Sequence, residues 1–167
     1  TITATTSIAG TGGVTQGTTG ILNINGTSGI TTLTATAVGN IVNYTGAAQT
    51  CKVTTYDNLT LSGSGAKTFA TAPTVNNLLS LEGTATITVT TGVVSYGANA
   101  TLQYNKGASY TATSEEWITP FVATGGIIIK NTGAITTPGV VQIGNNTSVP
   151  LTINVGSTLT PGANSIT

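Results

Sequence analysis

The segment YTATSEEWITPF holds the residues whose types and spacing could do chemistry. It contains the adjacent acids Glu115 and Glu116 and the single tryptophan, Trp117. Two tyrosines, Tyr104 and Tyr110, lie shortly before these acids. An aromatic ring beside carboxylates on a surface loop can stack on a sugar ring and bind its hydroxyls. These five residues are the candidate ligand-binding residues, and they make a carbohydrate-binding module one predicted function.

The same segment also has a structural interpretation, which we favour. It falls in one of the longest gaps of a sequence repeat described below, and it includes Pro120. A corner loop that bulges outward would use Trp117 and Phe121 to cover the core.

Catalysis is not expected. The sequence has no histidine, which removes imidazole bases and the common zinc sites. Adjacent Glu115 and Glu116 on an extended strand would point to opposite sides, so they could not flank one glycosidic bond. The remaining acids, Asp57 and Glu82, lie in different repeats and are expected to be solvated. We therefore predict that the chain is not an enzyme, with no catalytic residues, no cofactor and no metal.

The composition excludes two classes of partner. Charged residues make up 5% of the chain, and the net charge is zero without any arginine. Nucleic-acid binding and attraction to anionic lipid both need a basic surface, so neither partner is expected. No apolar run is long enough for a membrane span, so membrane insertion is not expected either. Abundant Thr favours strands, and Gly and Asn favour tight corners.

The rest of the sequence repeats one pattern: apolar, any, apolar, any, then Gly or Asn. Clear instances begin at Leu22, Val42, Leu59 and Leu79, looser ones at Leu102, Ile127 and Leu151, and a faint one at Ile2. One alternating strand cannot bury its apolar face alone, so regular repetition predicts a chain that winds into stacked parallel coils. The predicted fold class is all-β, a β-solenoid of the parallel β-helix kind with coils of about 20 to 25 residues.

The alternation assigns each residue of the pattern to a side. The predicted inward residues are Leu22, Ile24, Val42, Tyr44, Leu59, Leu61, Leu79, Leu81, Leu102, Tyr104, Ile127, Ile129, Leu151 and Ile153. The predicted corner glycines are Gly26, Gly46, Gly63, Gly83, Gly107, Gly133 and Gly156. The single cysteine, Cys51, lies in the alternating segment QTCKV and is predicted to be a small buried hydrophobe.

A β-sandwich of antiparallel strands is the alternative fold, because it also shows short strands at regular spacing. The dipeptides of tight hairpins are scarce, and one motif in one phase is more than a sandwich requires. These two features favour the solenoid.

Ice binding is a further predicted function. In TATITVTT, alternate threonines from Thr84 to Thr90 share one face, and some solenoids bind ice through a flat threonine ladder. Such a ladder needs threonine at one fixed place in every coil. LSLEG, LQYNKG and IIIKN break that rule, so we favour ordinary exposed strand residues.

The chain also resembles a known class of repeat. VNYTGAAQTCKVTTYDNLTLSGSGAKTF, VNNLLSLEGTATITV and ATLQYNKGASYTATSEEW resemble repeat regions of very large secreted and cell-surface proteins of the Bacteroidetes. Those proteins are exported by the type IX secretion system, and some are adhesins linked to gliding motility. The resemblance implies a non-enzymatic stalk or adhesive fibre outside the cell, at the bacterial surface.

The resemblance also implies partners. These are flanking repeats of the same polypeptide, together with surface glycans or other cell-surface proteins. The chain starts in mid-pattern with TITATT and contains no methionine, so residues 1–167 are predicted to be one solenoid segment of a much longer repetitive protein. Unpaired strand edges at cut ends should promote self-association.

Overall fold

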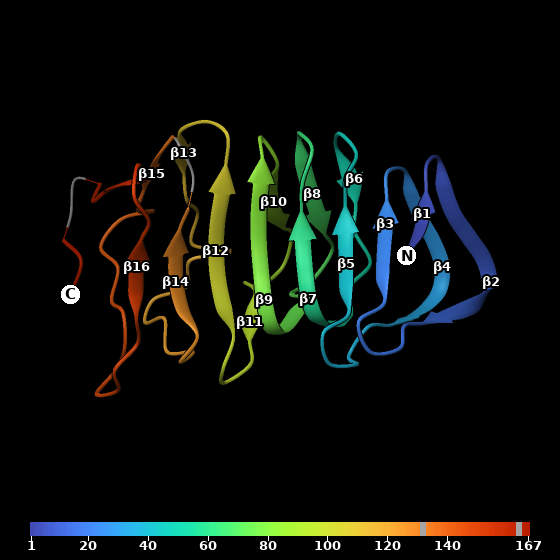
Figure 1. The fold of residues 1–167 in the computed structure, drawn as a ribbon, viewed down its shortest axis with the longest axis horizontal. Coiled ribbons are helices and arrows are strands. Elements are labelled where there is room, and N and C mark those ends of the chain that lie inside the picture. Colours follow the sequence, from blue (N-terminus) through green and yellow to red (C-terminus); the bar gives the residue numbers. More distant parts are fainter. Residues whose placement is uncertain (131–132, 163–164) are drawn as a thin grey trace.

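The computed structural model describes residues 1–130, 133–162 and 165–167, and these residues form strands and no helix. The strands stack in parallel as a β-solenoid of about eight turns, as the repeat predicts. The turns follow one another along one axis, with the two chain termini toward opposite ends (Figure 1). The β-sandwich alternative is wrong, because every strand pairing in the structure is parallel.

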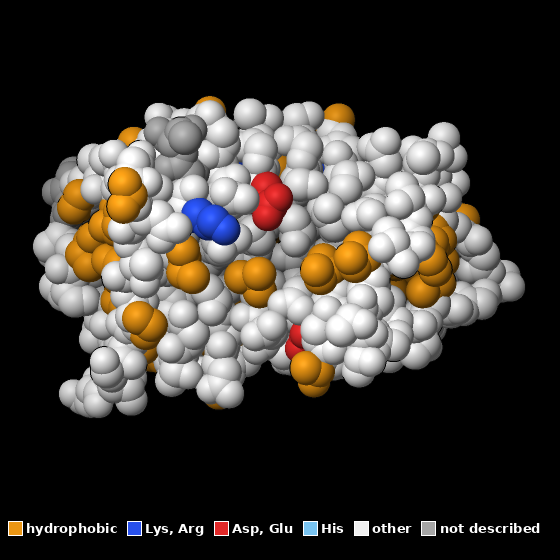
Figure 2. Space-filling model, viewed as in Figure 1, with side chains coloured by type: hydrophobic (Ala, Val, Ile, Leu, Met, Phe, Trp, Pro, Cys, Tyr) orange, Lys and Arg blue, Asp and Glu red, His pale blue; other side chains and the backbone are white. Residues whose placement is uncertain are grey.

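One long sheet forms the first side of the solenoid and faces the reader in Figure 1. Its strands run in the order β1 (Ile2–Ala4), β3 (Ile21–Ile24), β5 (Ile41–Tyr44), β7 (Thr55–Leu61), β9 (Thr74–Gly83), β12 (Thr101–Lys106), β14 (Gly126–Ile129) and β16 (Leu151–Ile153). Successive strands belong to successive coils, so each strand pairs with its counterpart in the coil before and the coil after. The face of this sheet is largely uncharged (Figure 2).

Three smaller sheets form the second side. They are β2 (Ser7–Thr15) with β4 (Thr27–Thr34), then β6 (Gln49–Thr50), β8 (Ala66–Phe69) and β10 (Thr86–Val89), and then β13 (Tyr110–Thr111), β15 (Ala134–Thr136) and β17 (Thr158–Thr160). A third, shorter side is held by the starts of β7 and β9 with β11 (Ser95–Tyr96), and by isolated bridges such as Ala35 to Tyr56.

The register of the long sheet stacks like positions on like positions. One inward column runs from Ile2 through Leu22, Val42, Leu59, Leu79, Leu102 and Ile127 to Leu151. The twelve predicted inward residues from Leu22 to Ile129 are all buried, and so is Cys51. Leu151 is half-buried and Ile153 is 48% exposed, because in the described residues β16 pairs with one strand, β14, instead of two. The faint repeat at Ile2 is a real coil, since β1 pairs with β3.

The backbone geometry of the corners explains why glycine occupies most of the predicted corner positions. A Cβ on Gly46 would lie 2.0 Å from the carbonyl oxygen of Asn25 in the coil before, so the stacked backbones leave no room for a side chain. Gly63 needs a left-handed backbone, with φ of 72°. Gly107 also lies at a corner, directly after β12, but it has no atom within 4 Å of an added Cβ. Its corner is open, so glycine is not required there.

These two glycines give a matched test of coil stacking. Gly46→Ala should lower the free energy of unfolding by at least about 2 kcal/mol, because the methyl group must push the two coils apart. Gly107→Ala should change it by less than about 0.5 kcal/mol, since its corner is open. Urea denaturation followed by circular dichroism measures both values. Equal effects would contradict the close approach of the coils at Gly46.

Candidate functional site

The candidate segment leaves the solenoid after β13 and folds back toward its interior. Residues 114–116 form a turn, which is closed when the Trp117 N–H donates to the Thr113 carbonyl oxygen at 3.0 Å. The expectation of an extended strand at Glu115 and Glu116 is therefore wrong. The turn still sends the two carboxylates to different places, one into the core and one to the coil before.

Glu116 is fully buried and is the centre of a hydrogen-bonded cluster. Its Oε1 accepts from the Thr113 N–H at 2.9 Å, the Tyr110 hydroxyl at 3.0 Å and the Tyr104 hydroxyl at 3.4 Å. The Thr113 hydroxyl donates to Oε2, and the Tyr96 hydroxyl donates to the Glu116 carbonyl oxygen at 2.7 Å. Burial raises the pKa of this carboxyl group, while the hydrogen bonds from Thr113 oppose that rise.

Lys106 adds a buried cation beside the same tyrosines. Its Nζ lies 4.2 Å from the centroid of the Tyr110 ring and donates to the Ala85 carbonyl oxygen. Burial lowers the pKa of Lys106 to about 8, although the negative charge of Glu116 favours the protonated amine. Burial and the same negative charge raise the pKa of Tyr104 and of Tyr110. These groups hold one another in place and leave no carboxylate open to a ligand.

Trp117 lies inside the fold, with 0% of its surface exposed. Its ring centroid lies 5.9 Å from that of Tyr104, and Phe121 is also fully buried. The structural interpretation of the segment as core cover is therefore confirmed. The prediction that Trp117 offers an exposed surface for stacking is wrong, because a buried indole has no free face for a sugar ring. The indole N–H has no hydrogen-bond partner.

Glu115 is half-buried and fastens the segment to the preceding coil. Its Oε2 accepts from the Val89 N–H at 2.7 Å, and its carbonyl oxygen accepts from the Val94 N–H at 2.8 Å. The structure thus brings four of the five candidate residues into one interior cluster and places Glu115 beside it. Ligand binding by these five residues stays a prediction, and the burial of the cluster gives it no support.

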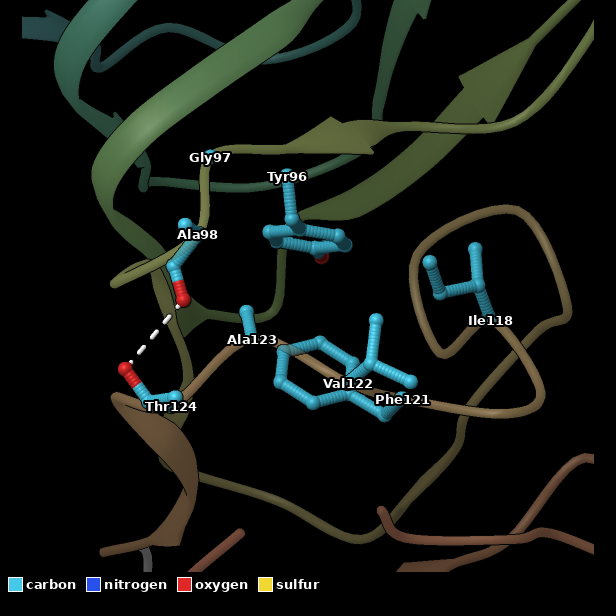
Figure 3. Close-up of a pocket in the computed structure, with 8 residues that line it drawn as sticks. All are labelled: Tyr96, Gly97, Ala98, Ile118, Phe121, Val122, Ala123 and Thr124. Carbon is cyan, nitrogen blue, oxygen red and sulfur yellow. Dashed lines mark hydrogen bonds between the residues drawn. The ribbon is translucent and has the colours of Figure 1, made fainter. Parts of the chain in front are cut away.

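A small pocket lies beside the cluster, with a volume of about 250 Å³. It is lined by Tyr96, Gly97 and Ala98 of the third side and by Ile118, Phe121, Val122, Ala123 and Thr124 of the folded-back segment (Figure 3). The Thr124 hydroxyl is already bonded to the Ala98 carbonyl oxygen, at 3.2 Å, and the Tyr96 hydroxyl to Glu116. The lining therefore suits an apolar group better than a sugar, whose hydroxyls would find few free partners.

Three buried charged residues were not found from the sequence: Lys106, described above, and Asp57 and Lys67. Asp57 is 7% exposed, and its Oδ2 accepts from the Gly39 N–H and from Asn58 Nδ2, both at 2.8 Å. The expectation that Asp57 is solvated is wrong. Lys67 is fully buried and donates to the carbonyl oxygens of Gly46, Ala47 and Ser64. The signal for Lys67 was present, because it stands two residues before inward Phe69 in AKTF.

Cys51 has no chemistry to offer at neutral pH. Its side chain is 4% exposed, and burial raises the pKa of the thiol to about 12. The thiolate is the reactive form of cysteine, so a protonated buried thiol is inert.

Threonine recurs at a fixed place on the second side. The segments LSLEG, LQYNKG and IIIKN, in which the sequence analysis looked for recurring threonine, do not belong to this side. Thr50, Thr68 and Thr88 share one outward column, and Thr111, Thr136 and Thr160 share another. Ice binding stays a prediction, and Thr86 and Thr88 of the segment that suggested it lie in β10 on this side.

Comparisons with known proteins identify no relative. No protein-family model matches the chain, and neither the curated proteins nor the solved structures contain a match. Within the described residues, no three cysteine or acidic side chains gather as a metal site would require. The described part of the chain also has no helix of the length and hydropathy that a bilayer span requires.

The core role of Trp117 predicts a stability effect. Trp117→Ala should lower the free energy of unfolding by about 3 to 5 kcal/mol, because it leaves a large cavity. Val122→Ala, at a side chain that is 48% exposed, should cost less than about 0.5 kcal/mol. Chemical denaturation measures both. A Trp117→Ala variant with unchanged stability would show that the indole does not cover the core.

The lowered pKa of Lys106 predicts a dependence on pH. The ordinary lysine pKa is 10.5, so between about pH 8 and pH 10 the unfolded chain binds more protons at this residue than the folded chain. The free energy of unfolding should therefore rise with pH in that window. Above about pH 10 the tyrosines of the unfolded chain ionise, and the trend should reverse.

Thermal unfolding midpoints at pH 7.5 and pH 9.5 test this dependence. Lys106→Met keeps the length of the side chain without the charge, so its midpoint should rise less than that of the parent chain. Lys67, whose pKa burial also lowers, remains in both proteins. Identical shifts in the two proteins would show that Lys106 does not titrate as described.

Proposed function

We propose that this chain is a non-enzymatic length of stalk or adhesive fibre at a bacterial cell surface. The observation that carries the proposal is the uninterrupted parallel sheet, in which β1, β3, β5, β7, β9, β12, β14 and β16 pair in sequence along the whole axis. Among the described residues, no strand of this series is left unpaired with the next. At about 4.8 Å per coil, eight coils make a rod roughly 34 Å long between the first and last strands.

The use of polar groups supports a structural role. Glu116, Lys67 and Lys106 are buried, and each is hydrogen-bonded to backbone groups of the chain itself. Groups fixed in this way hold corners and connections, and they are not positioned to act on a substrate. The resemblance to gliding-adhesin repeats supports the extracellular location and the type IX export route, and it makes neighbouring repeats the first expected partners.

The surface is also suited to exposure outside the cell. Threonine hydroxyls rather than charges cover the second side, for example Thr68 and Thr88. Parallel stacking pairs the backbone of each inner coil with two neighbours, which limits the local opening that proteases need.

Pulling the chain between its two termini tests the stalk role. Because each coil is one stacked unit, we expect resistance to force with extension steps of one or a few coils. One coil of 17 to 25 residues should release roughly 60 to 90 Å, at about 3.5 Å per residue. Gly46→Ala should yield at lower force and Gly107→Ala at the parent force. Extension without any force plateau or peak, as for an unfolded chain, would refute the stalk proposal.

A further inference from the structure

The outward face of the long sheet carries an acid and a base in one row of side chains. In β12 the buried residues alternate with Thr101, Gln103 and Asn105, whose side chains therefore point outward. The register of β9 on β12 sets Glu82 opposite Asn105. Glu82 is half-buried and belongs to the same outward face.

Lys130 lies on the other side of Asn105. It follows the buried residue Ile129, and it is exposed. Its N–H donates to the Tyr104 carbonyl oxygen at 2.8 Å, which continues the register of β14 on β12 by one residue. Glu82 and Lys130 are thus one coil before and one coil after Asn105, and acidic and basic side chains are visible on this face in Figure 2.

This arrangement is complementary to itself. We propose that the outward face of the long sheet binds a second copy of this chain, with the two solenoids side by side and antiparallel. The copies are related by a half-turn about an axis in the plane of contact, parallel to β12. That rotation keeps each row of side chains and reverses the order of the coils. Glu82 of each copy then faces Lys130 of the other, which gives two pairs of opposite charge.

The neighbouring side chains fit the same axis. In the row of Gln103, the residues one coil before and one coil after are Ser80 and Ile128, so the rotation sets a small side chain against a large one. On the axis itself, Thr101, Gln103 and Asn105 each meet their own counterpart. Hydroxyl and amide groups both donate and accept, so these three can bond to an identical group, whereas a charge there would repel itself.

The acid is already held in place on this face. The Ser80 hydroxyl donates to Glu82 Oε1 at 2.9 Å, and Gln103 Nε2 donates to the Ser80 hydroxyl at 2.9 Å. Side chains fixed before binding lose less conformational entropy when a second copy docks. The row is therefore prepared for a polar contact.

The charges also determine the direction of the contact. A half-turn about an axis parallel to the solenoid would keep the order of the coils and reverse the rows, which places Leu78 opposite Glu82. Both charges would then lack a partner, so the antiparallel contact is favoured. Fibres that reach toward each other from two opposing surfaces meet antiparallel, and this contact would join them. That adhesive role rests on the proposed function, whereas the contact itself depends only on the sheet face.

The size of the face predicts a weak contact. Centred on β12, the overlap covers the five strands β7, β9, β12, β14 and β16. It measures roughly 24 Å by 20 Å, at about 4.8 Å per strand and about 3.3 Å per residue. Two such faces bury about 1,000 Å², which is at the low end for specific contacts, so dimers should form only at high micromolar concentration. The face lies on the side of the solenoid, so further coils at either end would leave it uncovered.

Reversing the two charges tests the proposal. Sedimentation velocity of the parent chain, from about 10 µM to about 1 mM, should show a monomer–dimer equilibrium. Glu82→Lys sets lysine against lysine twice, and Lys130→Glu sets acid against acid twice. Each single variant should dimerise at least about tenfold more weakly than the parent. The double variant restores both pairs at zero net charge and should dimerise as the parent does.

A matched control separates the pairing from net charge. Glu82→Lys gives the chain a net charge of +2, because the parent is neutral. Val93→Lys combined with Val140→Lys gives the same net charge at exposed side chains outside the named strands, and this control should dimerise as the parent does. Circular dichroism of each variant checks that it is folded.

Three results would overturn the proposal: a parent chain that stays monomeric at about 1 mM, single variants that dimerise as the parent does, or a folded double variant that does not dimerise. The stalk function is tested separately by pulling. A chain that resists force but stays monomeric would keep that function and lose this docking face.

Discussion

Parallel stacking at a fixed spacing is the constraint on which the rest of this structure depends. Each coil rests on the one before at about 4.8 Å, so an inward residue always meets its counterpart from the neighbouring coils. The columns through Leu22 and Ile24 are the direct result. The same spacing brings corner backbones so close that Gly46 has no room for a Cβ. Coils can therefore differ in length only in the segments that lie outside the paired strands.

The corners explain the unusual use of charge. Four of the eight charged side chains are buried, namely Asp57, Lys67, Lys106 and Glu116. Corners interrupt the strand ladder and leave backbone groups without a partner, which is costly inside a protein. The buried lysines donate to such carbonyl oxygens, and the buried acids accept from such N–H groups. A long polar side chain can reach these groups where another strand cannot.

The segment between β13 and β14 shows how the stack absorbs extra chain. Glu116 gathers the hydroxyls of Tyr104 and Tyr110, and Trp117 fills the space beside them. Residues that would suit a sugar site on an open loop therefore serve as a second layer of core. What remains accessible is the small apolar pocket next to Tyr96 and Phe121.

The sequence by itself determined the fold, the coil boundaries and the inward columns, because alternation and a repeat of fixed phase leave one way to bury every apolar face. The same alternation placed Cys51 inside and Thr86 and Thr88 outside. Only the tertiary structure decided which polar residues are buried at the corners and in the segment between β13 and β14. Asp57 and Glu116 look like surface acids in the sequence. Their burial depends on backbone donors that corner geometry and the folded-back turn bring to them, and no local pattern encodes those contacts.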